Sequence, residues 1–308
     1  MAREQIKKKN NTSALILAGF VLVFWSGAAS AFKIALRILR PFELLFIATI
    51  ISFLILSLIM FLSGKFRSLI ALPGKDIFRL MIAGMFNPVF YYLILFKAYE
   101  LLPAQFAQAI NFTWPLVLAL FTMILGREKF HVLRILALCI SFAGVLVLVL
   151  GGRSFPGGLS LPGILLAFFS TFFWVFYWMT ARNVQADAVV SLWVPFTTAT
   201  IVLLVPACFL FRPAGLDSGT LIATAYVGLF EMSITFLLWL KALRKTASTA
   251  LIGNFIYAVP FLSLVFIRFF LKEQVLLTTV IALLLIAGGI LAQLFLHMGK
   301  FSVGNRSE

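Results

Sequence analysis

Long apolar runs, separated by short polar and basic stretches, follow one another along the whole chain. The runs cover approximately residues 13–32, 42–63, 77–97, 103–125, 132–150, 161–181, 189–211, 219–240, 248–270 and 276–297. A helix needs roughly 20 residues to cross about 30 Å of hydrocarbon, and the runs lack the alternation of membrane-spanning strands. Because lipid satisfies no exposed backbone group, each run is expected to be helical. The pattern predicts an all-α membrane protein with ten transmembrane helices.

Composition and charge agree with lipid as the surrounding solvent. Hydrophobic residues make up 63% and charged residues 11% of the 308 positions, and a soluble domain could not bury that much apolar surface. The net charge of +15 does not indicate nucleic acid, because the basic residues lie in short clusters between the runs. The lipid bilayer is therefore the expected partner.

The basic residues also predict an orientation. On the N-terminal side of the predicted bundle we count 17 of the 25 lysines and arginines, which indicates an inner-membrane protein with both termini cytoplasmic. Lys33, Arg37 and Arg40 fall on the opposite side, and an inward-facing Lys33 would ease this conflict. The first run contains Trp25 and shows no clear small-residue cleavage site, so it is expected to be a membrane helix rather than a signal peptide.

A pattern in the fourth run returns in the ninth. Asn111-Phe112-Thr113-Trp114-Pro115 is echoed by Asn254-Phe255-Ile256-Tyr257 and Pro260. Other pairs keep the same order at separations of 144 to 149 residues: Gly84 and Gly228, Lys97 and Lys241, Trp25 and Trp174. The sequence thus predicts two repeats, residues 1–152 and 153–308, with five helices each. Because five is odd, the repeats are inverted, as in many transporters that use alternating access.

Short motifs recur at matching places in these repeats. The first helix contains Trp25-Ser26-Gly27 followed by Lys33 and Pro41, and the second repeat starts with Trp174, Tyr177 and Arg182. The fourth and ninth helices end in Pro115 with Gly126-Arg127-Glu128 and in Pro260 with Lys272-Glu273. From about Leu15 to Leu296 the chain resembles the drug/metabolite transporter superfamily, specifically its ten-helix EamA family. The resemblance implies transport of small metabolites such as amino acids, or of drugs. Thr49 stands where the family often carries an arginine.

Glu231 is the one acidic residue that the pattern places deep in a membrane helix. It lies near the middle of the run 219–240, and Asn87 precedes it by 144 residues, the separation of the repeats. Intramembrane charges are costly, so a functional reading makes Glu231 a proton-coupling site or a site for a substrate ammonium. The alternative is a carboxylate paired with a lysine or a hydroxyl for helix packing.

Amide and aromatic side chains supply the other candidates. Gln105, Gln108, Asn111 and Pro115 recur at spacings of three and four, which places them on one helix face, and either they line a cavity or they hold helices together. Trp25 and Trp174 lie well inside their helices, where they either contact substrate or pack in the core. The candidate substrate-binding residues are Trp25, Asn87, Tyr91, Gln108, Asn111, Trp114, Trp174, Tyr177, Glu231, Asn254 and Tyr257.

Catalytic, metal and cofactor chemistry have little support in the sequence. The two histidines are far apart, the two cysteines, Cys139 and Cys208, are expected to be packing residues, and no nucleotide-binding or nucleophile motif occurs. Gly144 and Gly288-Gly289 indicate close helix packing.

We therefore predict a secondary transporter, not an enzyme, without a cofactor, acting as a monomer or homodimer, with protons as a possible second partner. The favoured activity is export of an amino acid. Alternatives are a lipophilic drug or lipid-linked sugar as cargo, a membrane-embedded enzyme, or an inactive scaffold.

Overall fold

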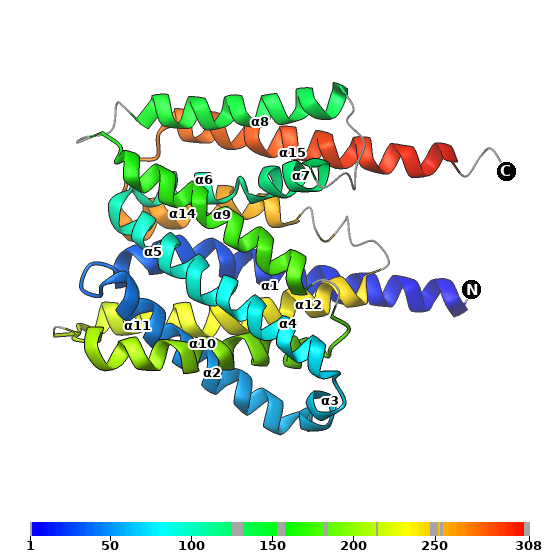
Figure 1. Cartoon of the computed structure of the whole chain (residues 1–308). Coiled ribbons are helices and arrows are strands. Elements are labelled where there is room, and N and C mark those ends of the chain that lie inside the picture. The colour runs from blue at the N-terminus through cyan, green and yellow to red at the C-terminus, as the bar shows by residue number, and fades with distance from the viewer. Residues whose placement is uncertain are drawn as a thin grey trace.

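The computed structural model describes residues 2–124, 132–152, 158–181, 184–213, 215–246, 252 and 255–304, and every regular element in them is a helix. Residues 2–152 contain α1 (Ala2–Ala35), α2 (Pro41–Leu62), α3 (Phe66–Ile70), α4 (Gly74–Gly84), η1 (Met85–Phe90), α5 (Tyr91–Leu101), α6 (Ala104–Asn111), α7 (Trp114–Ile124) and α8 (Val132–Gly151). Residues 158–304 contain α9 (Leu161–Ala181), α10 (Ala188–Leu210), α11 (Ser218–Tyr226), η3 (Val227–Ile234), α12 (Thr235–Lys245), η4 (Ile256–Ala258), α14 (Val259–Phe266), η5 (Ile267–Leu271) and α15 (Leu277–Gly304). The start of α1 and the end of α15 lie on the same side of the bundle (Figure 1).

The bundle contains the segments that a multi-pass membrane protein requires. Seven of the described segments are long and apolar enough to span a membrane: Thr12–Ala35, Pro41–Leu62, Gly74–Leu101, Ala104–Phe121, Leu161–Ala181, Ala188–Leu210 and Ser218–Lys245. Three shorter apolar helices occupy the fifth, ninth and tenth predicted runs: Ile135–Gly151, Ile256–Leu271 and Leu277–Ala292. Large apolar side chains such as Phe20 and Leu54 are exposed on the outside, where lipid would cover them. Cys139 and Cys208 are also exposed, so their predicted packing role is wrong.

Two of the spanning segments depart from a regular α-helix near the middle. After α4 the chain kinks in η1, where Asn87 leaves helical geometry (φ −142°, ψ 119°) and Pro88 has no N–H to donate. α11 instead continues without a break into η3, a widened helical turn that contains Glu231. Widened helical turns often occur at functional sites because they change the direction of side chains without ending the helix.

The fourth predicted run is also interrupted, because it forms α6 and α7 with a turn between them. Pro115, in the first turn of α7, cannot donate a hydrogen bond to the carbonyl of Asn111. Gln105, Gln108 and Asn111 all lie on α6, whereas Pro115 belongs to the next helix. The predicted shared helix face therefore describes only the first three of these residues.

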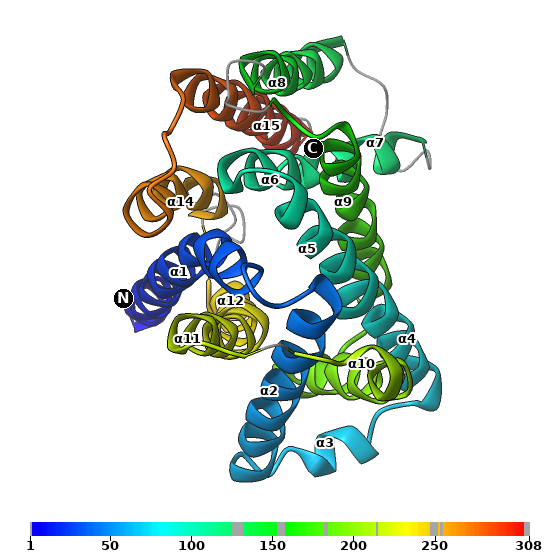
Figure 2. The same cartoon turned by 90° about the vertical axis from the view of Figure 1, so that its left-hand side faces the viewer.

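α8 and α15 pack against each other as an outer pair (Figure 2). A Cβ atom on Gly144 would lie 2.8 Å from the carbonyl oxygen of Ala282, and one on Gly289 would lie 2.5 Å from that of Ala137. Close packing is thus confirmed at both glycines. A Cβ on Gly288 would meet nothing within 4 Å, so the prediction is wrong there.

Candidate functional site

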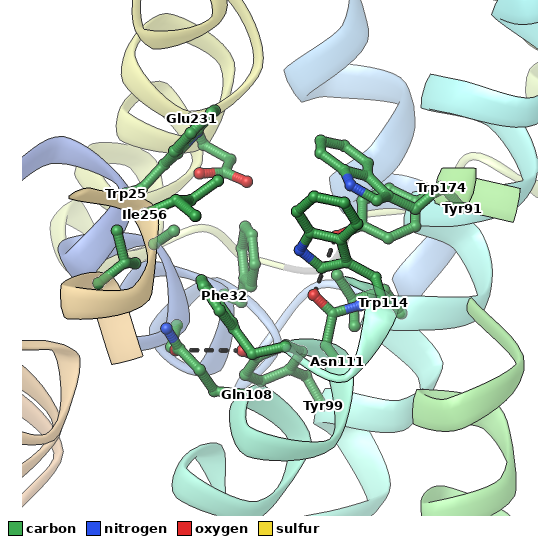
Figure 3. A pocket seen from close by; sticks show the side chains of 15 residues that line it. Trp25, Phe32, Tyr91, Tyr99, Gln108, Asn111, Trp114, Trp174, Glu231 and Ile256 are labelled. Carbon is green, nitrogen blue, oxygen red and sulfur yellow. Dashed lines mark hydrogen bonds between the residues drawn. The ribbon is translucent and has the colours of Figure 1, made fainter. Parts of the chain in front are cut away.

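A cavity of about 60 Å³ lies between helices from both halves of the chain. Its walls come from α1, α5, α6 and the start of α7, and from α9, η3, η4 and α14. The lining residues are Trp25, Ala28, Ala29, Phe32, Tyr91, Leu95, Tyr99, Gln108, Asn111, Phe112, Trp114, Trp174, Glu231, Ile256 and Val259 (Figure 3). A mostly apolar and aromatic wall with a few polar groups is the usual composition of a small-molecule site.

Tryptophan rings dominate the apolar wall. Trp25 packs edge-on against Phe236 with ring centroids 5.5 Å apart, and Trp174 lies 5.6 Å from the same ring. The centre of the Trp174 ring also lies 4.9 Å from that of Tyr91 and 6.3 Å from that of Trp114. The two tryptophans that occupy matching places in the predicted repeats therefore line one cavity. Their electron-rich faces attract cations as well as apolar groups.

Glu231 supplies the only carboxylate among the described residues that line this cavity. Its side chain is 8% exposed, and its Oε1 atom accepts a hydrogen bond from Tyr92 Oη at 3.0 Å. Its Oε2 atom is buried and has no hydrogen-bond partner among the described residues. Figure 3 shows the carboxylate directed into the space between Trp25 and Trp174. The hydroxyl of Tyr92 thus satisfies Oε1 alone, and Oε2 is left to bind a proton or a cationic group.

Two amide side chains form another part of the lining. Asn111 Oδ1 accepts a hydrogen bond from Tyr91 Oη at 3.1 Å, while its Nδ2 donates to Ser170 Oγ at 3.1 Å. Gln108 Oε1 accepts a hydrogen bond from Ser263 Oγ at 2.8 Å. Both serines lie in the second half of the chain. Asn111 and Gln108 therefore both line the cavity and hold helices together, which are the two roles that the sequence left open for these amides.

A group of hydrogen bonds lies where α5 passes into α6. Lys33 Nζ donates to the backbone carbonyls of Tyr99 at 2.8 Å and Leu102 at 3.0 Å. Glu273 Oε1 accepts a hydrogen bond from the N–H of Ala104, the first residue of α6, at 3.0 Å. Lys33 therefore faces inward, as its position in the sequence suggested.

Gln105 adds three hydrogen bonds at the same place. Its Nε2 donates to the carbonyl of Gln274 at 2.8 Å, while its Oε1 accepts from Leu276 N–H at 3.2 Å and from Thr279 Oγ1 at 2.8 Å. The side chain is 1% exposed. We refer to Lys33, Gln105 and Glu273 as the α5–α6 latch. Lys33 ties α1 to the end of α5, while Gln105 and Glu273 join the start of α6 to residues 273–279, one helical turn from the cavity residue Gln108.

A second polar cluster fixes the connection between α9 and α10. The Asp187 carboxylate caps α10 by accepting from Val189 N–H at 2.9 Å, and it forms an ion pair with Lys65 at 3.2 Å. Arg244 donates to the carbonyl of Ala186 at 2.6 Å. Partial burial opposes ionisation, but the amide and the ammonium prevail and hold the pKa of Asp187 below its usual value.

The structure brings seven of the eleven predicted site residues to the cavity: Trp25, Tyr91, Gln108, Asn111, Trp114, Trp174 and Glu231. Asn87 is buried in η1 away from the lining, and its Oδ1 has no partner among the described residues. The ring of Tyr177 lies 6.1 Å from that of Trp174, and Tyr257 packs both against the main core and against the smaller cluster around Leu116 without lining the cavity. Asn254 lies outside the described residues.

Sequence reasoning missed several lining residues, and helical spacing could have found some of them. Phe32 lies seven residues after Trp25, and Leu95 and Tyr99 lie four and eight residues after Tyr91, so each shares a helix face with a predicted residue. Aliphatic residues such as Ile256 carry no such signal, since every face of these helices is apolar.

The bundle, its apolar exterior and its buried aromatic and polar cavity are those of a membrane transporter. The profile of the EamA-like transporter family matches residues 12–150 and again residues 161–295. The chain belongs to the EamA-like transporter family.

Relatives of the chain have transporter names. The uncharacterized transporter YvbV of Bacillus subtilis (strain 168) is 23% identical over 296 residues, which cover 92% of each chain. The aromatic amino acid exporter YddG of Ancylobacter novellus is 29% identical over 189 residues, which cover 59% of this chain and 63% of that protein. One solved crystal structure shares the fold with a TM-score of 0.65 and 24% identity, covering 93% of this chain and 98% of that one. Family and names thus indicate a transporter rather than an enzyme.

Proposed function

We propose that this protein is a secondary active transporter that exports a small amino-group-bearing metabolite, an amino acid with an aromatic or other apolar side chain. The observation that carries the proposal is the free Oε2 of Glu231 beside the indole rings of Trp25 and Trp174. A substrate ammonium would pair with the carboxylate, and the apolar part of the substrate would stack on the rings. The exporter in Ancylobacter novellus, which is named for aromatic amino acids, gives further support.

Proton coupling would follow from the same carboxylate. A proton on Glu231 and a substrate ammonium beside it satisfy the same free oxygen, so each would exclude the other. A proton entering from one side would then release the substrate to that side, and the result is exchange of substrate for protons. Such competition at one group needs no second ion-binding site.

Alternating access fits the dimensions of the cavity. At about 60 Å³ the space holds water but is far smaller than the roughly 300–1,000 Å³ of typical ligand pockets. The helices must therefore separate before a metabolite enters, and opening beside Gln108 requires the α5–α6 latch to break. We propose that residues 1–152 and 153–308 form the two inverted five-helix halves that move against each other in the inner membrane, with both termini cytoplasmic.

A lipophilic drug or a lipid-linked molecule is the second candidate cargo. A separate cavity of about 500 Å³, almost wholly apolar, lies on another face of α1, where Gly27, Ser30 and Tyr226 contribute to its lining. Such a space suits an apolar molecule that enters sideways from the bilayer. Its described lining residues include no charged group that could recognise an amino acid.

Transport in proteoliposomes tests the proposal. Vesicles containing the purified protein and a labelled aromatic amino acid should release the label when a pH gradient is imposed, and unlabelled amino acids should compete. Competition by cationic dyes but not by amino acids would favour the second candidate. Absence of flux for both classes would contradict the proposed function.

A further inference from the structure

A groove of about 870 Å³ runs along α14, η5 and α15, away from the cavity described above. Its apolar lining includes Phe261, Leu264 and Val280, and its two charged lining residues are Arg268 and Lys272. The groove therefore combines an apolar trough with cationic charge.

The outer wall of the groove exposes large apolar side chains. Val265 and Phe269 are 60% and 64% exposed, although both lie on helices made almost entirely of apolar residues. In a bilayer, acyl chains are the molecules available to cover such a surface.

The two cations are not neutralised by carboxylates among the described residues. Arg268 Nη1 reaches only the backbone carbonyl of Glu273, at 3.5 Å, and Lys272 Nζ lies 5.1 Å from the centre of the Phe269 ring. The Glu273 carboxylate is directed elsewhere, because its Oε1 accepts from the N–H of Ala104. Arg268 and Lys272 are thus free to bind an anion that lies at the end of the groove.

The backbone at Lys272 adds an independent observation. This residue ends η5 in the left-handed conformation, with φ +57° and ψ 19°. Glycine is the residue usually found at such a helix end, because a Cβ atom makes the conformation unfavourable. A lysine that accepts this backbone conformation in place of glycine indicates a role for its side chain.

We propose that this groove binds an anionic phospholipid of the surrounding membrane. The phosphate lies between the Arg268 guanidinium and the Lys272 ammonium, and one acyl chain follows the apolar trough along Leu264 and Val280. A guanidinium and an ammonium can bind a phosphate through charge-assisted hydrogen bonds. The proposal does not depend on the cargo of the transporter.

Thermal unfolding of the delipidated protein in detergent tests the proposal. Dioctanoyl phosphatidylglycerol should raise Tm more than dioctanoyl phosphatidylcholine, because a ligand that binds only the folded state stabilises it. Each removed cation should weaken phosphatidylglycerol binding by up to about fivefold, as expected for an exposed ion pair. Arg268→Gln/Lys272→Gln should therefore lose most of the difference between the two lipids, whereas the matched exposed control Arg67→Gln/Lys75→Gln should keep it.

Lys272→Gly separates lipid binding from a structural role. It relieves the left-handed strain, so Tm without lipid should not fall, yet its response to phosphatidylglycerol should weaken. Equal responses of the wild type and Arg268→Gln/Lys272→Gln to phosphatidylglycerol would overturn the proposal. The proposal would also be overturned if inorganic phosphate alone raised Tm as much as phosphatidylglycerol does. That result would show a site for the anion without a site for the lipid chain.

Discussion

Glu231→Gln changes the proposed substrate contact and leaves the shape of the cavity almost unaltered. Glutamine can still accept the hydrogen bond that Tyr92 Oη donates to Oε1 at 3.0 Å. At the position of Oε2, which has no partner among the described residues, it places an NH₂ group that repels an ammonium and cannot take up a proton. We expect the folded protein to tolerate this change, because a neutral amide is easier to bury than a carboxylate.

The loss of affinity can be estimated from the one contact removed. A hydrogen bond to a charged group contributes about 1.5–3 kcal/mol. Its loss weakens apparent substrate affinity by roughly 10- to 150-fold, at 1.4 kcal/mol per factor of ten. Aromatic contacts with Trp25 and Trp174 remain, so binding should weaken rather than disappear.

Counterflow and pH-driven efflux in proteoliposomes measure the two parts of this prediction separately. Counterflow needs no coupling ion, and in the variant it should show a raised KM for the amino acid. Efflux under a pH gradient needs the proton site, and it should lose its dependence on pH. Thermal unfolding of both proteins in the same detergent checks that the fold is intact.

Glu43→Gln is the matched control, because Glu43 is also buried within a membrane helix but lies outside the cavity. Its carboxylate pairs with Arg40 at 2.7 Å and accepts from the N–H of Arg212 at 3.1 Å. This variant should lose stability while it keeps the wild-type KM. Wild-type KM and pH dependence in Glu231→Gln would refute the role given to Glu231. The same rise in KM in both variants would show that the effect comes from the fold.

Three further predictions concern the latch, helix packing and an ion pair. Gln105→Ala removes three hydrogen bonds of the latch and should make the cavity more accessible. A cysteine introduced in the cavity by Ala29→Cys should then react faster with a water-soluble maleimide. An unchanged labelling rate would argue against the latch. Gly84→Ala places a Cβ 2.6 Å from a backbone carbonyl of α10 and should destabilise by about 1–3 kcal/mol in thermal unfolding, whereas Gly19→Ala, with open space around it, should not. Asp187→Asn keeps a cap on α10 but loses a half-exposed ion pair with Lys65, which costs about 0–1 kcal/mol. In the folded protein the pKa of Asp187 lies below the usual 3.8. The difference in stability between the wild type and Asp187→Asn should therefore be complete above pH 3.8, and it should vanish as the pH falls through the pKa of Asp187 in the folded protein.

The sequence by itself determined that this chain is a bundle of membrane helices, and it selected most of the polar candidates. Lipid leaves the backbone no partner but itself, so length and apolarity are enough to predict a helix. A charge in such a helix is costly, which makes Glu231 conspicuous without any structure. The matching order of Trp25 and Trp174 identified two residues that the structure brings to one cavity.

Only the tertiary structure decided which faces of these helices meet. In a soluble helix the apolar side marks the core, but here lipid-facing and core-facing residues are both apolar, so periodicity does not tell them apart. Phe32 and Ile256 could therefore not be assigned to the cavity, and Asn87, polar and deep, lies away from its lining. The hydroxyl of Tyr92, which satisfies one oxygen of Glu231 and leaves the other free, comes from a helix 139 residues earlier in the chain. Packing between distant helices, rather than local sequence, turns the buried carboxylate into a candidate binding group.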